Sequence, residues 1–99
     1  MIKHIVMWRL KEVAHGNTAM ENAILIKERL EALRGRIPGM VSIEVGLDFS
    51  RTEGSSDIVL YSEFIDRSAL KGYQSHPEHE ALKPFIGEAS SERRLVDYE

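Results

Sequence analysis

The chain has 99 residues, of which 42% are hydrophobic and 29% are charged, and it carries a formal net charge of -3 and no cysteine. This length supports one hydrophobic core, so we expect a single domain over residues 1–99. The absence of cysteine excludes a disulfide framework and a thiol nucleophile. The charge is spread through the sequence without a basic stripe, which argues against a nucleic-acid partner.

The first ten residues have the pattern of a β-strand, because the side chains alternate between two faces. One face carries Ile2, His4, Val6, Trp8 and Leu10, and the other carries Lys3, Ile5, Met7 and Arg9. Charged residues are too frequent here for a secretory signal or a membrane-spanning segment. We therefore expect a cytoplasmic protein with no membrane partner.

A helix is expected after this strand. Thr18 and Glu21 have the spacing of a capping box, in which each side chain satisfies a free backbone N–H group at a helix start. Apolar residues then recur every three or four positions, as on one side of a helix: Ala23, Ile26, Leu30, Leu33 and Ile37. Four polar residues are expected to face solvent: Lys27, Glu28, Glu31 and Arg34. Gly35 and Pro38-Gly39 are expected to end the helix.

Three further strands are expected. Residues 41–47 alternate, with Val41, Ile43, Val45 and Leu47 on one face, and residues 58–64 are rich in β-branched and aromatic side chains. The polar, turn-rich residues 50–56 predict that these two strands form a hairpin with a long loop. Residues 93–98 predict a last strand, in which Arg93 and Arg94 are interpreted as an exposed or edge charge pair.

Short helices are expected between the strand at residues 58–64 and the strand at residues 93–98. Asp66 suits the N-cap of a helix that runs to about Ser75. Pro77 suits the first position of a second helical piece, which Pro84 and Gly87 are expected to limit.

The element order β, α, β, β, α, β predicts an α+β fold of the ferredoxin-like type, a four-stranded antiparallel sheet with helices on one face. Nothing in the chain is left to cover the other face of the sheet, yet Ile5 and Met7 lie on it. A second copy packed sheet against sheet would bury these side chains. We therefore expect a homodimer.

His76 and His79 belong to the densest polar cluster, together with Tyr73, Glu78 and Glu80. Residues three apart share one side of a helix, so both histidines could approach one metal ion. The spacing is not that of the zinc signature His-Glu-x-x-His, and no third ligand is evident nearby. The alternative is a solvated helix start, with His76 as the capping residue and the glutamates stabilised by the helix dipole. We assign no metal site.

His4 is expected to be buried on the helix-facing side of the first strand, where an imidazole needs a hydrogen-bond partner. One interpretation is a core histidine bound to a hydroxyl group or a backbone carbonyl. The other is a donor or base in a cavity between sheet and helices, where desolvation would keep it neutral. Trp8 and Phe85 are either core residues or the side chains that contact a small apolar ligand.

Three stretches together resemble the stress-responsive α/β-barrel (Dabb) domain family. They are the start Met-Ile-Lys-His-Ile-Val-Met-Trp-Arg-Leu-Lys, the segment from Tyr73 to His79, and the ending Val96-Asp97-Tyr98. The resemblance covers nearly all of the chain. It implies a ferredoxin-like protomer whose sheet packs against that of a second protomer, so that the dimer forms an α/β barrel.

One plant member of that family cyclises a polyketide without a cofactor, and the resemblance implies roles for three residues here. His79 resembles its catalytic histidine, Tyr73 the tyrosine paired with it, and His4 a pocket histidine of the first strand. In such chemistry an imidazole removes an acidic proton between carbonyls while a phenol stabilises the enolate. The plant member has a further pocket histidine where this chain has Asp57, a difference that separates the two sequences.

Two hypotheses about function follow. The first is a dimeric domain of unassigned activity with a small apolar ligand pocket between sheet and helices. The second is a cofactor-free enzyme, similar to a polyketide cyclase or to an isomerase or lyase, that acts on a carbonyl substrate with the His79 and Tyr73 pair.

Overall fold

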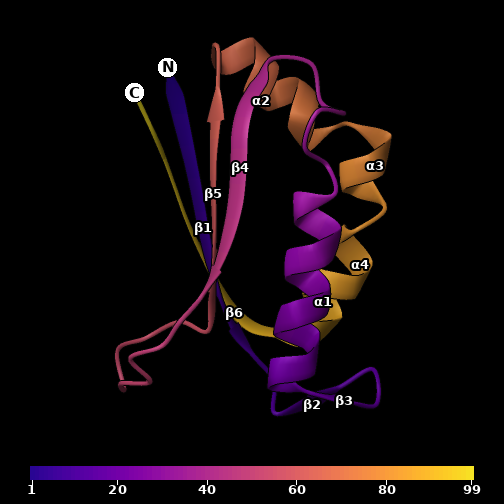
Figure 1. Ribbon diagram of the computed structural model, residues 1–99, viewed down its shortest axis with the longest axis vertical. Helices are drawn as coiled ribbons and strands as arrows, with labels where there is room; N and C mark the ends of the chain where they lie inside the picture. The colour runs from indigo at the N-terminus through magenta and orange to yellow at the C-terminus, as the bar shows by residue number, and fades with distance from the viewer.

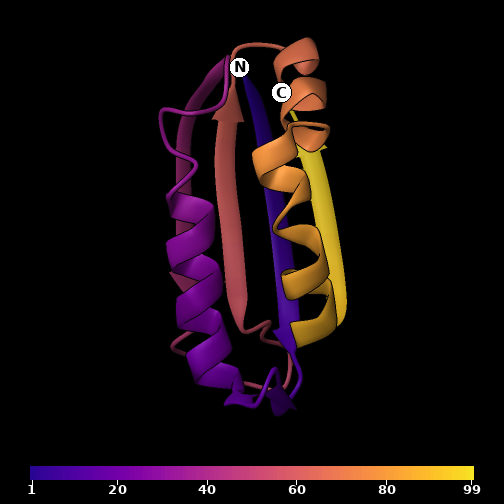
Figure 2. The same ribbon diagram turned by 90° about the vertical axis from the view of Figure 1, so that its right-hand side faces the viewer.

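Four strands form one antiparallel sheet, and all the helices lie on one side of it (Figure 1). The computed structural model describes residues 1–99. Its elements are β1 (Ile2–Leu10), β2 (Val13–Ala14), β3 (Asn17–Thr18), α1 (Ala19–Glu31), β4 (Met40–Leu47), β5 (Ile58–Phe64), α2 (Arg67–Gln74), α3 (Pro77–Glu80), α4 (Lys83–Ala89) and β6 (Ser90–Tyr98). In Figure 2, α1 covers one half of the sheet and α2 to α4 cover the other half. No helix has both the length and the apolar character needed to cross a membrane.

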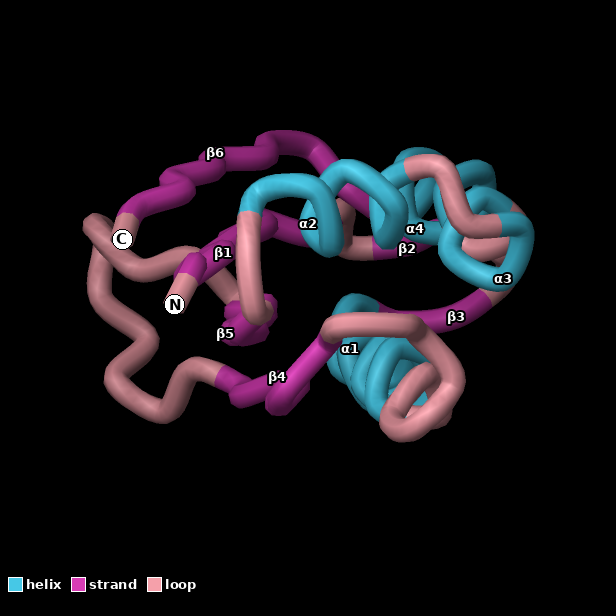
Figure 3. The backbone as a smooth tube through the Cα atoms, turned by 90° about the horizontal axis from the view of Figure 1, so that it is seen from above, coloured by secondary structure: helices cyan, strands magenta, loops and turns pink.

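The strand order of the sheet is β4-β5-β1-β6, and every neighbouring pair is antiparallel. Helices connect β1 to β4 and β5 to β6, whereas a loop without helices connects β4 to β5. This is the ferredoxin-like arrangement, so the expected fold class is confirmed. The two chain ends lie side by side in Figures 1 and 3, because Lys3 of β1 is opposite Tyr98 of β6.

The alternation predicted for β1 is confirmed by burial. Its five even-numbered residues face the helices and are between 1% and 8% exposed. At the centre of this row, Val6 is opposite Leu60 of β5 and Leu95 of β6. Apolar area removed from water stabilises the fold by about 25 cal/mol per Å². The inner face of β1 is therefore the floor of the core.

The capping box predicted at the start of α1 is present. The hydroxyl oxygen of Thr18 accepts a hydrogen bond from the Glu21 backbone N–H at 3.2 Å, and the Glu21 carboxylate accepts one from the Thr18 N–H at 2.8 Å. The helix ends at Glu31, earlier than expected. Leu33 and Ile37 lie in the turns beyond it but are only 4% and 5% exposed, so these turns carry the last residues of the apolar stripe into the core.

β4 is an edge strand, and its predicted alternation fails at its start. Ile43 and Val45 are buried as expected, but Val41 is 52% exposed. The reason is that the register with β5 shifts between Met40 and Ser42, which turns the intervening side chain outward.

Three polar side chains of α1 and the turn after it bind the free edge of β4 and are not simply solvated as expected. The Lys27 ammonium donates to the Val45 carbonyl at 2.5 Å, and the Glu31 carboxylate accepts from the Val45 N–H at 3.0 Å. Arg34 donates to the Ile43 carbonyl at 2.6 Å. The Val45 N–H is the main cause that lowers the pKa of Glu31, so this carboxylate is ionised where it holds the strand.

A short hairpin of β2 and β3, which the sequence analysis did not predict, precedes α1. Its turn contains His15 and Gly16, with φ angles of 55° and 73°. The buried Asn22 of α1 holds the hairpin, since its amide donates to the Ala14 carbonyl at 3.0 Å and accepts from the Asn17 amide at 3.1 Å. Strands of two residues are too short to produce a period-two pattern.

The helices before β6 differ from expectation at their ends. Asp66 caps α2 as predicted, because its carboxylate accepts a backbone hydrogen bond from the first turn at 2.8 Å. Pro84 and Gly87, which were expected to limit a helix, lie inside α4. Proline is tolerated in the first turn of a helix, where the missing N–H would have no partner. β6 follows at once and begins at Ser90, earlier than expected.

The sheet face turned away from the helices is uncovered, as Figure 1 shows. It carries apolar and aromatic side chains from three neighbouring strands: Ile5, Met7, Val59, Tyr61, Val96 and Tyr98. Met7, Val96 and Tyr98 are 38%, 48% and 47% exposed. We call this surface the open sheet face.

Replacing Thr18 by alanine tests the capping box. The change leaves the Glu21 N–H without its acceptor, so we expect the free energy of unfolding to fall by about 1 kcal/mol in urea denaturation. Thr52→Ala is the control, because the Thr52 hydroxyl contacts only the Ser55 hydroxyl in the exposed β4–β5 loop, at 2.9 Å. Equal losses in both variants would contradict the role assigned to the cap.

Candidate functional site

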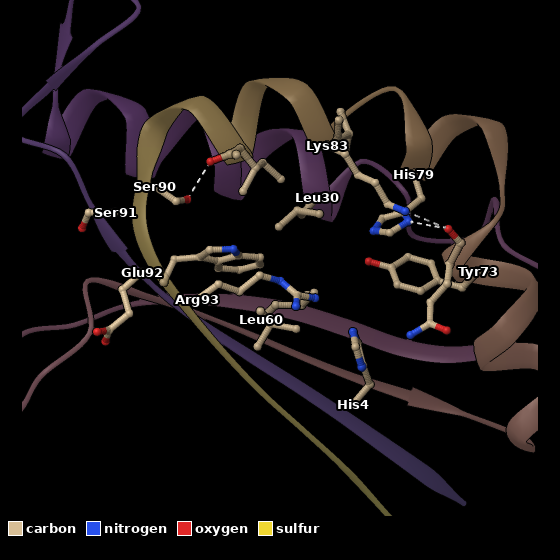
Figure 4. Close-up of a pocket in the computed structure, with 16 residues that line it drawn as sticks. His4, Leu30, Leu60, Tyr73, His79, Lys83, Ser90, Ser91, Glu92 and Arg93 are labelled. Atoms are coloured by element: carbon tan, nitrogen blue, oxygen red, sulfur yellow. Dashed lines mark hydrogen bonds between the residues drawn. The ribbon is translucent and has the colours of Figure 1, made fainter.

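A cavity of about 600 Å³ lies between the inner face of the sheet and the helices. Its apolar walls come from the sheet, α1 and the segment around α4: Val6, Trp8, Leu30, Leu60, Leu82 and Ile86. Figure 4 shows polar side chains directed into it from the sheet below and the helices above. We call it the sheet–helix cavity.

Tyr73 lies at one end of this cavity and is completely buried. It is three residues beyond Leu70 on the buried side of α2. Its ring centroid is 5.2 Å from that of Phe64 on the sheet. The phenol oxygen points into the cavity in Figure 4 and has no hydrogen-bond partner in the protein. Burial raises the pKa of Tyr73 to about 12, so the phenol is a protonated donor at neutral pH.

His79 of α3 lies against Tyr73, with ring centroids 4.2 Å apart. Its Nδ1 is 3.4 Å from the carbonyl oxygen of Gln74, and a carbonyl only accepts hydrogen bonds. This contact therefore favours the hydrogen on Nδ1 and leaves Nε2 with a free lone pair. Burial lowers the pKa of His79 below its usual 6.5, so the ring is neutral at neutral pH.

His76 has a structural role at the start of α3. Its Nδ1 accepts a hydrogen bond from the backbone N–H of Glu78 at 3.1 Å, as the capping interpretation expected. No group of three or more histidine, aspartate or glutamate side chains is arranged to hold a metal ion.

His4 lies on the cavity floor and is 3% exposed. The partner of its Nδ1 is the carboxylate of Asp97, not the hydroxyl group or backbone carbonyl expected from the sequence. The register explains this difference, because β6 places Asp97 directly opposite His4. The His4 ring meets that of Tyr73 edge to face, with centroids 6.0 Å apart. Tyr73 thus lies in contact with both candidate histidines.

The two aromatic residues expected to contact a ligand, Trp8 and Phe85, have different positions relative to the cavity. Trp8 lines the cavity, but Phe85 does not. The Phe85 ring stacks on His15 of the β2–β3 hairpin, with centroids 4.2 Å apart, and Arg29 lies over it at 4.0 Å. Phe85 therefore connects α4 to the hairpin and to α1 outside the cavity, and Trp8 is the aromatic candidate that lines it.

Asp57 is also outside the cavity. Its carboxylate accepts a hydrogen bond from the Leu10 backbone N–H at 2.7 Å and so holds the end of β1.

Arg93 and Arg94 are both exposed on the edge strand β6, as expected, but Arg93 also lines the cavity, which the sequence did not indicate. β6 places it opposite Trp8, on the inner face, and turns Arg94 to the open sheet face opposite Met7. The alternation of β6 contains this signal, because Asp97, Leu95 and Arg93 share one face. The register of β6 with β1 is needed to decide which of its two faces turns inward.

Comparison with known proteins identifies the fold and the family. Residues 2–99 match the profile of the Stress responsive A/B Barrel Domain (Dabb) family. A dimeric protein of unknown function and ferredoxin-like fold from Bacteroides fragilis is 37% identical, over 99% of this chain and 94% of that one, with a TM-score of 0.87. A dimeric ferredoxin-like protein of unknown function from Thermobifida fusca is 24% identical, over 98% and 88% of the two chains, with a TM-score of 0.80.

A hydroxynitrile lyase from Passiflora edulis has the same fold, with 16% identity over 98% of this chain and 90% of that one and a TM-score of 0.76. At this identity the similarity concerns the fold alone. Among curated proteins the search found no significant match. The family profile spans nearly the entire chain, and a relative more than one third identical shares its fold, so the chain belongs to the Stress responsive A/B Barrel Domain (Dabb) family.

Proposed function

We propose that the sheet–helix cavity binds a small molecule with an apolar body and an oxygen atom that accepts a hydrogen bond from Tyr73. The observation that carries this proposal is the buried Tyr73 hydroxyl without a partner in the protein. A buried donor without an acceptor costs about 1–3 kcal/mol. A carbonyl or hydroxyl oxygen of a ligand would remove this penalty.

The size and walls of the cavity support the same proposal. Its volume of about 600 Å³ lies within the usual range for small-molecule sites. Its side walls, such as Trp8 and Leu30, are apolar, whereas Tyr73 and His79 are close together at one end. Such a site would orient a mostly apolar ligand through the polar group of the ligand that reaches Tyr73.

A second candidate function is cofactor-free acid–base chemistry on a carbonyl compound, favoured by the contact between His79 and Tyr73. The neutral His79 ring has a free Nε2 lone pair, which would take the proton from the carbon next to the carbonyl. The electron pair of the broken C–H bond then moves to the carbonyl oxygen, where the protonated Tyr73 donates a hydrogen bond to the enolate. Return of the proton to another position would complete an isomerisation, whereas attack of the enolate carbon on a second carbonyl of the same molecule would close a ring.

We further propose that two copies associate through the open sheet face. The similar proteins from Bacteroides fragilis and Thermobifida fusca are dimeric. The open sheet face carries a row of exposed apolar side chains that nothing in the chain covers, among them Met7 and Val96. Sheet-to-sheet packing would bury them and add to the small core of a chain of this length.

Replacing Tyr73 by phenylalanine tests the binding proposal. We expect the affinity for carbonyl-containing aromatic ligands to fall about threefold to tenfold, because one buried hydrogen bond is lost. The unliganded protein should be at least as stable as the unmodified one, since the substitution removes a buried hydroxyl that has no partner there. Titration calorimetry and urea denaturation measure the two quantities.

Tyr61→Phe is the matched control for this substitution, because the Tyr61 hydroxyl lies on the open sheet face and donates to Glu63 at 3.0 Å. It should leave ligand affinity unchanged. The binding proposal is wrong if Tyr73→Phe and Tyr61→Phe bind every ligand as the unmodified protein does.

Replacing His79 by alanine tests the acid–base proposal. NMR would follow the exchange of deuterium into the carbon next to the carbonyl of 3-oxo esters such as ethyl 3-oxohexanoate, corrected for the rate in buffer. We expect the protein-dependent rate to fall at least about a hundredfold in His79→Ala, because the base is lost. His76→Ala, which removes a capping histidine, should retain the rate. Protein-dependent exchange that is absent from the start, or that survives in His79→Ala, would eliminate this function.

The pH dependence of that exchange follows from the pKa of His79. The ring acts as a base only when unprotonated, and its pKa is lowered below the usual 6.5. The rate should therefore be level around neutral pH and decline only as the pH falls below 6.5.

Replacing Ile5 by glutamate tests the proposed dimer, because it places a charge in the middle of the open sheet face. The unmodified protein should sediment at twice the 11.3 kDa mass of one chain at micromolar concentration, and Ile5→Glu as a monomer. Ile24→Glu, at a position of α1 that is 44% exposed, is the control and should remain dimeric. A single-chain mass for the unmodified protein would rule out the association.

A further inference from the structure

The charged groups that line the sheet–helix cavity are unevenly paired. Lys83 is one of the two permanently charged cations of the lining. Its ammonium donates to the Glu80 carboxylate at 2.6 Å and to the Gln74 carbonyl at 3.3 Å. The Lys83 charge is therefore balanced within the protein.

Glu92, the acidic residue of the lining, is also paired within the protein. One carboxylate oxygen of Glu92 accepts from Arg94 at 3.5 Å, and the other is 3.9 Å from the Arg9 guanidinium. Both of these arginines lie on the opposite side of the sheet from Arg93 in the strand alternation. Glu92 is thus drawn away from Arg93.

Arg93 is the remaining cation, and it makes neither a hydrogen bond nor an ion pair with any residue of the chain. Figure 4 shows its guanidinium beside Leu60 on the cavity floor, facing the end that holds Tyr73 and His4. Its charge acts on the phenol, because it lowers the pKa of Tyr73 against the larger effect of burial. The guanidinium therefore lies close to the proposed binding position of the ligand.

We propose that the ligand of the sheet–helix cavity is a small organic acid, whose carboxylate binds Arg93 while its apolar part contacts the Trp8 side of the cavity. This inference rests on the proposed binding function and adds the chemical class of the ligand.

A carboxylate is the group that this arrangement fits. The planar guanidinium presents two parallel N–H donors, which match the two oxygens of a carboxylate. Arg93 is exposed, so water solvates its charge in the unliganded protein. A ligand carboxylate would pair with this charge, and the partly enclosed site strengthens the attraction relative to open water. A ligand acid with a second oxygen, such as a keto acid, would satisfy Arg93 and the Tyr73 hydroxyl together.

Matched pairs of acids and their neutral primary amides test the inference, because each pair differs in charge but hardly in shape. The probes are 3-benzoylpropionate, 3-phenylpropionate and octanoate, each compared with its amide by titration calorimetry at neutral pH and low salt. We expect the unmodified protein to bind at least one acid about tenfold or more tightly than its amide. High salt should reduce this preference.

Three variants test whether Arg93 is the source of the preference for the acid over the amide. Arg93→Gln should lower the affinity for the acid to about that for the amide, and Arg93→Lys should retain part of the preference, because lysine keeps the charge but not the planar fork. Arg94→Gln is the matched control, since it removes the neighbouring charge from the other face of β6. It should keep the full preference. Circular dichroism checks that each variant is folded.

The outcomes separate this inference from the binding proposal. Equal affinity for acid and amide in the unmodified protein, or a preference that survives in Arg93→Gln, overturns the carboxylate assignment and leaves the binding proposal standing. Failure of all three acids and all three amides to bind overturns both.

Discussion

The alternation of β1 is the constraint on which the rest of the structure depends. β1 lies between β5 and β6, so both of its edges are paired and its inner face has to be buried. A strand has only two faces, and the spacing that builds the core therefore also selects the side chains that reach the cavity. His4 and Trp8 are in the cavity because they share a face with Val6. A shift by one residue would exchange them for the side chains of the open sheet face.

The break between α2 and α3 is the second element that forms the site. In one continuous helix, Tyr73 and His79 would point about 120° apart, because they are six residues apart along the chain. The chain instead leaves α2 after Gln74 and starts α3 at Pro77, with His76 as its N-cap. This turn brings the two rings to 4.2 Å. Pro77 thus starts α3 and also helps to place His79 against Tyr73 in the cavity.

Much of the fold could be predicted from the sequence, because long strands and the capping box of α1 have patterns that do not depend on distant residues. The burial of His4 and the capping role of His76 could be predicted for the same reason. Arg93 and Phe85 could not be placed in this way. Which face of β6 turns inward depends on its register with β1, and the direction of the Phe85 ring depends on a hairpin too short to give a pattern. Local periodicity identifies elements, whereas the lining of a cavity is decided by contacts between elements far apart in sequence.

The pairing of β1 with β6 has a consequence for how the protein folds. His4 and Asp97 are 93 positions apart, so the contact that holds His4 on the cavity floor forms only when β6 pairs with β1. Closing so large a loop also places this contact among the slow steps of folding. While β6 is unpaired, the chain can contain α1 to α4 and the pairing of β1 with β5, yet it lacks the cavity residues that β6 supplies, Ser90 to Arg93. Pairing of β6 and completion of the cavity are thus the same event in the folding of this chain.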